Sequence, residues 1–310
     1  MHEIIKFEEE HSKTPVTKII EPFIADSGVQ LFVKREDLIH PQISGNKWRK
    51  LKYNLIEARK RGISTLLTFG GAFSNHIHAT AAAGDFFGFK TIGIIRGEKP
   101  QILSPTLKFA IDKGMKLYFV SRAAYRDKKA LASTISQDLN PVYVLPEGGT
   151  NNLALKGCSE IVKNYIDNSN VDIWCSPCGT GGTLAGLVTA LSNNQKAVGF
   201  SVLKGDFLKT EVEQLLSNFG HLNSQNWSIN TAFHFGGYAK FDNNLIQFIN
   251  KFKADHQIQL DPIYTGKMFY GIYDLIQKGF FPKGSTIMAV HTGGQQGITG
   301  FNQRFGNILQ

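Results

Sequence analysis

The chain has 310 residues, 34 Lys and Arg against 25 Asp and Glu, a formal net charge of +9 and 42% hydrophobic residues. This length predicts two lobes or one large α/β unit, and the ordinary hydrophobic content excludes a disordered chain. The cations are scattered without a long run, so the charge is as compatible with attraction of small anions as with nucleic-acid binding.

The N-terminus and the cysteines indicate the cellular compartment to expect for the protein. The first ten residues are acidic and lack a long apolar core, so we expect no secretory signal, and no apolar stretch approaches the roughly 18 residues of a membrane span. Cys175 and Cys178 form a CxxC motif at the end of an expected strand, without a second motif of metal-ligand spacing. We therefore expect buried strand-end cysteines, no metal site and a cytoplasmic location.

Apolar strand-like runs alternate with helical patterns along the chain. The first half predicts strands at Gln30–Val33, Thr65–Phe69, Thr91–Ile95, Lys116–Val120 and Val142–Leu145, and helices ending near Arg61 and spanning His76–Gly84, Pro105–Lys113 and Ala123–Asp138. The second half predicts strands at Val171–Ser176, Ala197–Ser201, Ile229–His234 and Thr286–Val290, and helices from Asn151 to Ile166, from Gly182, and at Asn243–Lys253 and Gly266–Lys278. This order predicts parallel sheets with helices on both faces, and the lack of a linker predicts interleaved lobes.

The stretch Ser44–Leu51 places one lysine, Lys47, directly after a small-residue turn. Such a turn can hold the side chain in one direction while its amine reaches a reacting carbonyl, as Schiff-base chemistry with an aldehyde cofactor requires. A basic surface helix with its N-cap at Ser44 is the alternative interpretation.

Ligands of open parallel sheets bind outside the carboxyl ends of the strands, so the residues after each strand are candidates for a site. Gly70–His76 follows one such strand, and Ser74 stands where a helix begins. Ser74 can simply cap that helix. Alternatively, the free first-turn N–H groups, with Ser74, Asn75 and His76 beside them, can bind a carboxylate.

The segment Pro177–Thr183 follows another strand and opens a helix. Its closely spaced glycines allow several backbone N–H groups to turn toward one anion, and its threonine hydroxyls can complete the shell. It is neither a P-loop nor a dinucleotide-binding motif, because the sixth position counted from Gly179 is Leu184. We expect a single phosphate here, and a tight packing turn is the alternative.

Two further segments place hydroxyl groups at strand ends or helix starts. In Asp261–Lys267 an extended segment breaks into a helix at Tyr264, whose phenol can act as an acid–base group or can simply be a packing residue. His291–Gly294 follows the last strand, and Thr292 offers a hydroxyl that can meet a cofactor ring.

A lysine, a carboxylate-binding turn, a single-phosphate turn and a hydroxyl after the last strand together suit pyridoxal phosphate and an amino acid. With these motifs in this order, and Val33–Asp37 before them, the sequence resembles the family of 1-aminocyclopropane-1-carboxylate deaminase and D-cysteine desulfhydrase. These are fold type II, tryptophan-synthase β-like pyridoxal-phosphate enzymes. The resemblance implies two interleaved three-layer αβα lobes: a large one from residues 1–47 and 148–310, and a small inserted one from residues 48–147.

The resemblance also implies roles for single residues and an assembly. Lys47 would form the Schiff base, and with Ser74 and Tyr264 it makes up the catalytic set. The cofactor phosphate would be held by Gly179, Thr180, Gly181, Gly182 and Thr183, the ring hydroxyl by Asn75, and the region of the pyridine nitrogen by Thr265 and Thr292. Ser74, Asn75, His76 and Tyr264 would bind the substrate. A homodimer acting on a small amino acid is implied, with neither nucleic acid nor membrane as a partner.

Three positions indicate which reaction to expect. Members of the family that open the cyclopropane ring typically carry Gln, Glu and Leu at these positions. This sequence instead has His76, Thr265 and Thr292, and D-cysteine desulfhydrases resemble it in this respect. A threonine near the pyridine nitrogen makes a weaker electron sink than a carboxylate, which is adequate when a thiolate leaves from the β-carbon. We therefore expect β-elimination from D-cysteine to pyruvate, ammonia and sulfide. Ring opening to 2-oxobutyrate, another D-amino-acid β-elimination and a non-catalytic binding protein are the alternatives.

Overall fold

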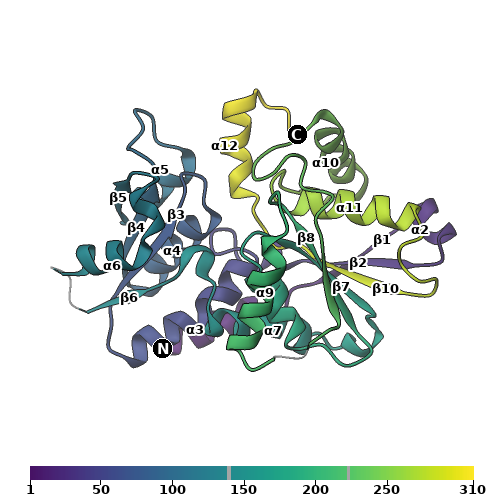
Figure 1. Cartoon of the computed structure of the whole chain (residues 1–310), viewed down its shortest axis with the longest axis horizontal. Helices are drawn as coiled ribbons and strands as arrows, with labels where there is room; N and C mark the ends of the chain where they lie inside the picture. Colours follow the sequence, from purple (N-terminus) through teal and green to yellow (C-terminus); the bar gives the residue numbers. More distant parts are fainter. Residues whose placement is uncertain (138–140, 222–223) are drawn as a thin grey trace.

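The computed structural model describes residues 1–137, 141–221 and 224–310, and it contains two sheets (Figure 1). The six-stranded sheet has the order β1 (Val16–Ile19), β2 (Gln30–Lys34), β10 (Thr286–Val290), β7 (Ile173–Cys178), β8 (Lys196–Ser201) and β9 (Trp227–Asn230). The four-stranded sheet has the order β5 (Lys116–Val120), β4 (Lys90–Arg96), β3 (Thr65–Gly70) and β6 (Val142–Val144). All pairs are parallel except β1 with β2, which confirms the predicted α/β class.

Helices cover both sheets. They are α1 (His2–His11), α2 (Pro22–Asp26), α3 (Asn46–Lys60), α4 (Asn75–Phe87), α5 (Pro105–Asp112), α6 (Lys128–Ser136), α7 (Asn152–Lys163), α8 (Gly182–Val188), α9 (Phe207–Asn218), α10 (Asn243–His256), α11 (Thr265–Gln277) and α12 (Gln296–Phe305). In Figure 1 the four-stranded sheet lies on the left with α4, α5 and α6, and the six-stranded sheet lies on the right, with α12 between the two halves. The chain crosses between the halves more than once, since β1 and β2 precede the small sheet and β7 to β10 follow it. The domain boundaries implied by the resemblance stay a prediction.

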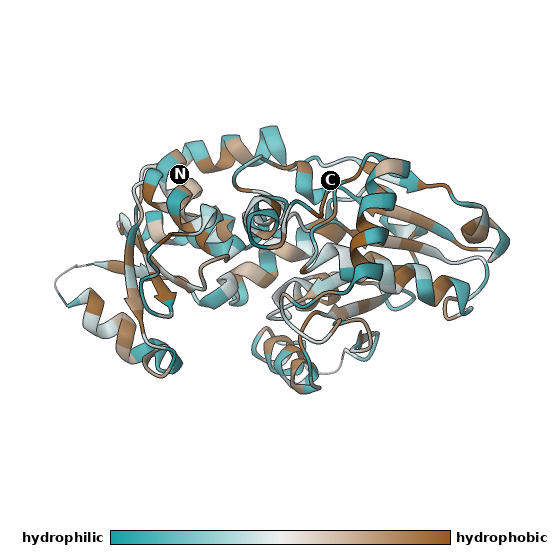
Figure 2. Ribbon diagram, turned by 90° about the horizontal axis from the view of Figure 1, so that it is seen from above, coloured by the Kyte–Doolittle hydropathy of each residue, from teal (hydrophilic) through white to brown (hydrophobic). Residues whose placement is uncertain are grey.

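The core of the large sheet follows the period of two along each strand. Ile173 and Cys175 of β7 belong to the hydrophobic cluster beneath α10 and α11, whereas Trp174 belongs to the cluster on the opposite face, with residues of α7 and α8. A strand buried on both faces has no solvent side, which explains why β7 consists entirely of buried residues. In Figure 2 hydrophobic residues run along the strands of both halves.

The sequence pattern located the strands of both sheets well but missed several outer elements. The helices α1, α9 and α12 and the edge strand β1 were not predicted, and β9 ends at Asn230 rather than at His234. The helix expected to reach Ile166 ends at Lys163, and a turn and a 3-10 helix at Asn168–Asn170 follow it. The predicted helix end at Asp138 lies outside the described residues.

The cysteine prediction is confirmed. Cys158, Cys175 and Cys178 are free and buried. Burial raises the pKa of the Cys178 thiol to about 12, which keeps it protonated and unreactive at neutral pH. Within the described parts of the chain, no helix has the length and the apolar character needed to cross a bilayer.

The first turn of the lysine-bearing helix α3 is fixed by buried charges. The guanidinium of Arg49 donates to the Glu36 carboxylate at 2.8 Å and to Glu8 of α1 at 3.2 Å. The indole of Trp48, the residue after the lysine, donates to the same Glu8 at 2.5 Å. Both Arg49 and Trp48 are almost completely buried. These bonds tie α1 to the first turn of α3.

Helices α3 and α7 approach closely at one glycine, Gly157, where a Cβ atom would lie 1.8 Å from the carbonyl oxygen of Arg49. We predict that Gly157→Ala lowers the free energy of unfolding by about 2 kcal/mol, because the helices must separate. Gly297→Ala is the matched control, since its Cβ would meet no heavy atom closer than 3.9 Å; it should be neutral or gain about 0.5 kcal/mol. Urea unfolding of the two variants tests this, and equal stability of both would contradict the close packing.

Candidate active site

The lysine turn, residues 44–47, is pressed against the loop that follows β10. Gly45 has φ +63°, and a Cβ there would lie 2.0 Å from the carbonyl oxygen of Thr292. The backbone N–H of Asn46 donates to the same oxygen at 3.4 Å, and the N–H of Gly45 donates to the carbonyl of Glu36 at 3.0 Å. Only glycine fits at position 45, and Lys47 is thereby placed in the first turn of α3, half-buried.

The glycine–threonine turn, residues 178–183, lies beside the lysine turn. It connects the end of β7 to the start of α8, with Gly181 at φ +73°. The amide of Asn46 donates to the hydroxyl of Thr183 at 2.8 Å. Two of the predicted segments, 137 positions apart in sequence, are therefore in direct contact.

A second lysine, which sequence reasoning missed, joins this turn. The ammonium of Lys50 donates to the carbonyl of Gly148 at 3.2 Å and to the hydroxyls of Thr150 at 3.1 Å and Thr180 at 3.4 Å. A Cβ atom on Gly182 would lie 3.1 Å from the same nitrogen. Lys50 is 2% exposed. A buried cation at a glycine turn with threonine hydroxyls is suited to bind an anion. Its position three residues after Lys47, on the same helical face, was the available signal.

The segment Ser74–His76 forms the start of α4. The Ser74 hydroxyl oxygen accepts a hydrogen bond from the N–H of Ile77 at 3.3 Å, so Ser74 is an N-cap, as one of the two interpretations expected. The cap uses a lone pair and leaves the hydroxyl proton free to donate. Among the described residues, the N–H groups of Asn75 and His76 have no hydrogen-bond partner. We call these two N–H groups and the Ser74 hydroxyl the carboxylate nest.

Asn75 and His76 reach in different directions. A Cβ on Gly294, in the loop after β10, would lie 3.2 Å from the amide nitrogen of Asn75, so Asn75 extends toward the large sheet. The Nε2 atom of His76 lies 2.8 Å from the hydroxyl of Thr68 on β3. Burial, with the charges of Lys47 and Lys50, holds the pKa of His76 well below its usual value. His76 is therefore neutral at pH 7.

Tyr264 lies next to the glycine–threonine turn, at the N-terminus of α11. A Cβ on Gly179 would lie 3.1 Å from its ring. The Asp261 carboxylate accepts from the N–H groups of Tyr264 at 2.7 Å and Thr265 at 2.9 Å, which fixes the start of the helix. Burial raises the pKa of Tyr264 well above its usual value, and Tyr238 and Asp261 add to the effect. The phenol is therefore protonated at neutral pH and can donate a proton.

The two candidate threonines differ in how far their hydroxyls are engaged. The hydroxyl of Thr265 donates to the Asp261 carboxylate at 2.7 Å and accepts from the Asp261 N–H at 2.9 Å. The hydroxyl of Thr292 makes no hydrogen bond within the described residues, although its carbonyl oxygen receives the N–H of Asn46. Of the two, Thr292 has the proton that is free to meet a ring nitrogen. The roles of both stay a prediction.

A loop carrying Tyr238 completes the surroundings of Tyr264. The two tyrosine rings are 6.1 Å apart between centroids in an edge-to-face arrangement. The buried amine of Lys267 donates to the carbonyls of His234 at 2.9 Å and Gly237 at 2.8 Å and so fixes this loop. Tyr238 was not singled out from the sequence, because the loop joins it to Tyr264 only in the folded chain.

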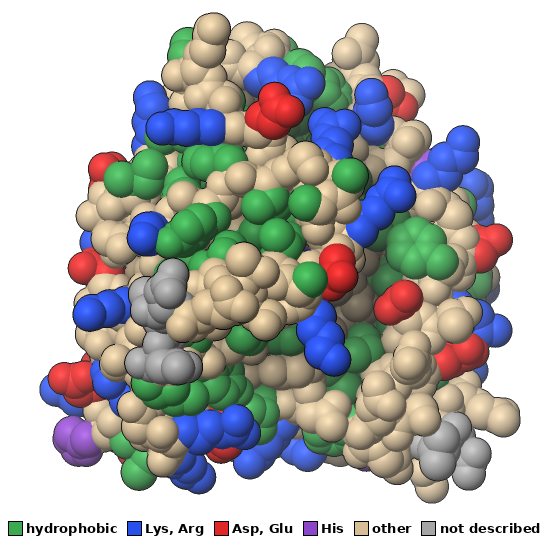
Figure 3. All heavy atoms as spheres, turned by 60° about the vertical axis from the view of Figure 1, so that its left-hand side comes forward, with side chains coloured by type: hydrophobic (Ala, Val, Ile, Leu, Met, Phe, Trp, Pro, Cys, Tyr) green, Lys and Arg blue, Asp and Glu red, His purple; other side chains and the backbone are tan. Residues whose placement is uncertain are grey.

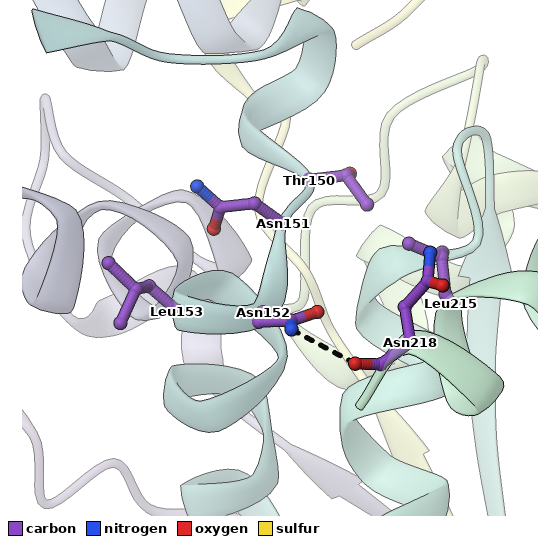
Figure 4. A pocket seen from close by; sticks show the side chains of 6 residues that line it. All are labelled: Thr150, Asn151, Asn152, Leu153, Leu215 and Asn218. Atoms are coloured by element: carbon purple, nitrogen blue, oxygen red, sulfur yellow. Dashed lines mark hydrogen bonds between the residues drawn. The ribbon is translucent and has the colours of Figure 1, made fainter. Parts of the chain in front are cut away.

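An open hollow of about 530 Å³ lies beside the glycine–threonine turn. It is lined by Thr150, Asn151, Asn152, Leu153, Leu215 and Asn218, and Figure 4 shows the bond from the Asn152 amide to the Asn218 carbonyl. The hydroxyl of Thr150 also accepts the hydrogen bond from Lys50. Lys47 does not line the hollow. On the face drawn in Figure 3, Lys and Arg side chains are dispersed among hydrophobic and acidic ones.

The electrostatics around Lys47 give a first prediction for the site. Burial and the neighbouring charge of Lys50 lower the pKa of Lys47 to about 7. In the ligand-free protein, labelling of Lys47 by an amine reagent, followed by mass spectrometry, should therefore reach half its maximal rate near this pH. Lys50→Met removes a positive charge and should shift the midpoint upward. A Lys47 that reacts only at strongly alkaline pH, or an unshifted midpoint in the variant, would contradict this electrostatic account.

Comparisons with known proteins show the family to which the chain belongs. Residues 8–293 match the family model of pyridoxal-phosphate dependent enzymes. The chain is 30% identical over 293 residues to a Pyrococcus horikoshii protein named provisionally as 1-aminocyclopropane-1-carboxylate deaminase, covering 91% of this chain and 90% of that one.

Two further comparisons narrow the family. The chain is 30% identical over 316 residues to the mitochondrial bifunctional D-cysteine desulfhydrase/1-aminocyclopropane-1-carboxylate deaminase of Arabidopsis thaliana, covering 93% of this chain and 78% of that one. A crystal structure of a homologue of 1-aminocyclopropane-1-carboxylate (ACC) deaminase superposes with a TM-score of 0.83 at 27% identity and covers all of both chains. The chain therefore belongs to the pyridoxal-phosphate-dependent enzymes of fold type II, in the family of 1-aminocyclopropane-1-carboxylate deaminase and D-cysteine desulfhydrase.

Proposed function

We propose that this enzyme eliminates the β-substituent of a small D-amino acid, with D-cysteine giving pyruvate, ammonia and sulfide. The observation that carries the proposal is the contact between the lysine turn and the glycine–threonine turn. It brings a lysine of lowered pKa together with an anion-binding group of hydroxyls and a buried cation.

The residues present fit pyridoxal phosphate. The Gly179–Thr183 backbone, the Thr180 and Thr183 hydroxyls and the Lys50 ammonium would hold the phosphate, and Lys50 can neutralise part of its charge. Asn75 would meet the ring hydroxyl, and Thr292 the ring nitrogen. Once bound through Lys47, the cofactor supplies an electron sink for the substrate α-carbon.

The carboxylate nest would orient the substrate. Its three donors all lie at the start of α4, a helix of 13 residues whose N-terminus favours an anion. Binding the carboxylate there fixes the α-carbon relative to Lys47. This assignment uses the backbone N–H of His76 and leaves its imidazole for another contact.

Two side chains are assigned to proton movements. Lys47 has a pKa of about 7 because of burial, so an uncharged amine is abundant at neutral pH and can take the α-proton at Nζ. Tyr264 retains its phenolic proton because its pKa is raised. It can supply this proton, from Oη, to the leaving sulfur. An uncharged amine and a protonated phenol are therefore available at the same pH.

Ring opening of ACC, giving 2-oxobutyrate and ammonia, is the second candidate, since relatives carry that name. Elimination is favoured by His76, Thr265 and Thr292, because D-cysteine desulfhydrases carry the same residues and because a threonine near the ring nitrogen makes a weaker electron sink than a carboxylate. Residue 265 is a threonine whose hydroxyl donates to Asp261, so this residue has no carboxylate of its own to keep the ring nitrogen protonated. Another D-amino acid with a leaving group at its β-carbon remains a third candidate.

We also propose a homodimer in the cytoplasm. Phe86 is 54% exposed and packs against Phe7 and His40, and Leu38, two residues before His40, is 53% exposed. Exposed apolar surface of this kind is commonly covered by a partner. The three free cysteines suit a reducing compartment.

Assays of both reactions test the proposed activity. We expect sulfide release from D-cysteine to exceed 2-oxobutyrate formation from ACC. Lys47→Ala should lower turnover by about three orders of magnitude or more and abolish the visible absorbance of the lysine-bound cofactor. Lys60→Ala, an exposed lysine at the end of the same helix, should change neither. Faster turnover of ACC than of D-cysteine would overturn the proposed substrate.

Replacing Tyr264 tests the proton donor. Tyr264→Phe keeps the ring against Gly179 but removes the phenolic proton, so kcat should fall about 100-fold while the visible spectrum is retained. Tyr270→Phe, a half-buried tyrosine of the same helix that packs against the core and against the rings of Phe233, Phe235 and Phe248, is the matched control. If Tyr264→Phe keeps the wild-type kcat, the proton comes from another group.

A further inference from the structure

His76 has a polar atom that nothing in the described protein satisfies. The residue is 1% exposed, and its Nδ1 atom is buried without a hydrogen-bond partner among the described residues. A buried nitrogen left unpaired carries a free-energy cost, and native proteins retain such atoms mainly where a ligand or a water meets them.

The hydrogen bonds of Thr68 decide which nitrogen of His76 carries the proton. The Thr68 hydroxyl lies 3.1 Å from the carbonyl oxygen of Leu145 and 2.8 Å from Nε2 of His76. A carbonyl oxygen only accepts, so the single hydroxyl proton of Thr68 is directed to Leu145. Thr68 must then accept from Nε2–H of His76. In the neutral ring this leaves Nδ1 as a bare lone pair, which accepts but cannot donate.

The edge of the ring that carries this lone pair faces the active site. A Cβ on Gly149 would lie 2.8 Å from Cε1 of His76 and 3.1 Å from Nδ1. The neighbours of Gly149, Gly148 and Thr150, hold the ammonium of Lys50. The three donated bonds of Lys50 occupy its three protons, so it has none left for His76. Glycine at 149 keeps space open in front of the lone pair.

We propose that Nδ1 of His76 accepts a hydrogen bond from the substrate, and that it selects amino acids with a thiol or hydroxyl on the β-carbon. This inference rests on the proposed function, because it assumes that the substrate carboxylate lies in the nest to which the backbone of His76 belongs. A carboxylate cannot donate to a bare lone pair, so the imidazole must meet another part of the substrate. A β-thiol or β-hydroxyl carries the required proton, and a cyclopropane ring carries none.

Two substitutions separate the two nitrogens. In His76→Gln the amide reaches the position of Nε2 and can still donate to Thr68, but the acceptor at Nδ1 is lost. In His76→Asn an oxygen can take the position of Nδ1, and the bond to Thr68 is lost. The affinities of the cofactor-loaded enzyme for D-serine and for D-alanine can be measured from the change in its visible spectrum. The ratio of the two affinities gives the preference for a β-hydroxyl. We expect His76→Gln to lose about tenfold of this preference and His76→Asn to keep most of it.

His78→Gln is the matched control. His78 lies on the same helix, is also buried and also has an unpartnered Nδ1, but its pKa is lowered to about 4 by burial alone, without an effect of the two lysines. This variant should keep the full preference for D-serine. If His76→Gln keeps the preference, or if both His76 variants lose it equally, the assignment of Nδ1 is wrong.

A second measurement does not depend on turnover. Nitrogen NMR of ¹⁵N-histidine-labelled full chain, with the His76 signals assigned by their loss in His76→Gln, reports the tautomer without substrate. We expect Nε2 to be protonated and Nδ1 to be bare at neutral pH. A protonated Nδ1 would overturn the inference while leaving the proposed elimination intact. Absence of D-cysteine turnover in an enzyme with the expected tautomer would instead overturn the proposed function.

Discussion

The close approach of two backbones organises the candidate active site. Gly45 touches the carbonyl of Thr292, and the next residue bonds both to that carbonyl and to Thr183. The lysine turn is thereby held between the ends of β10 and β7, two neighbouring strands of the large sheet. A side chain at position 45 would separate these segments. The direction of Lys47 is thus set by a backbone contact that only glycine permits.

Burial then determines the chemistry of the side chains at this junction. The same desolvation lowers the pKa of Lys47 and of His76 and raises that of Tyr264, because it disfavours each charged form. Behind the site the opposite arrangement holds, since Arg49 keeps its charge through direct bonds to carboxylates. One helix therefore has a fully paired cation on one side and an amine ready to lose its proton on the other.

Sequence reasoning found the strands and the motifs that follow them, since these depend on local apolar patterns and on glycine placement. It found Lys47 and the glycine–threonine turn as separate features. It missed that Lys50 closes this turn, for which the spacing from Lys47 was the one signal. It could not find that Tyr238 lies against Tyr264, because this contact joins distant segments. Nor could it distinguish the hydroxyl of Thr265, which Asp261 occupies, from that of Thr292. The helices α1 and α12 were missed because they lie beyond the alternating segments from which the other elements were predicted.

The central claim is that Lys47, rather than its buried neighbour Lys50, carries the cofactor. Borohydride reduction of the cofactor-loaded enzyme, followed by peptide mass mapping, tests this directly, because the reduced bond survives digestion. The account predicts a pyridoxyl group on the peptide containing Lys47, with fragment ions that place it at this residue and leave Lys50 unmodified. A pyridoxyl group on Lys50 or on Lys267, or none on the Lys47 peptide, would contradict it.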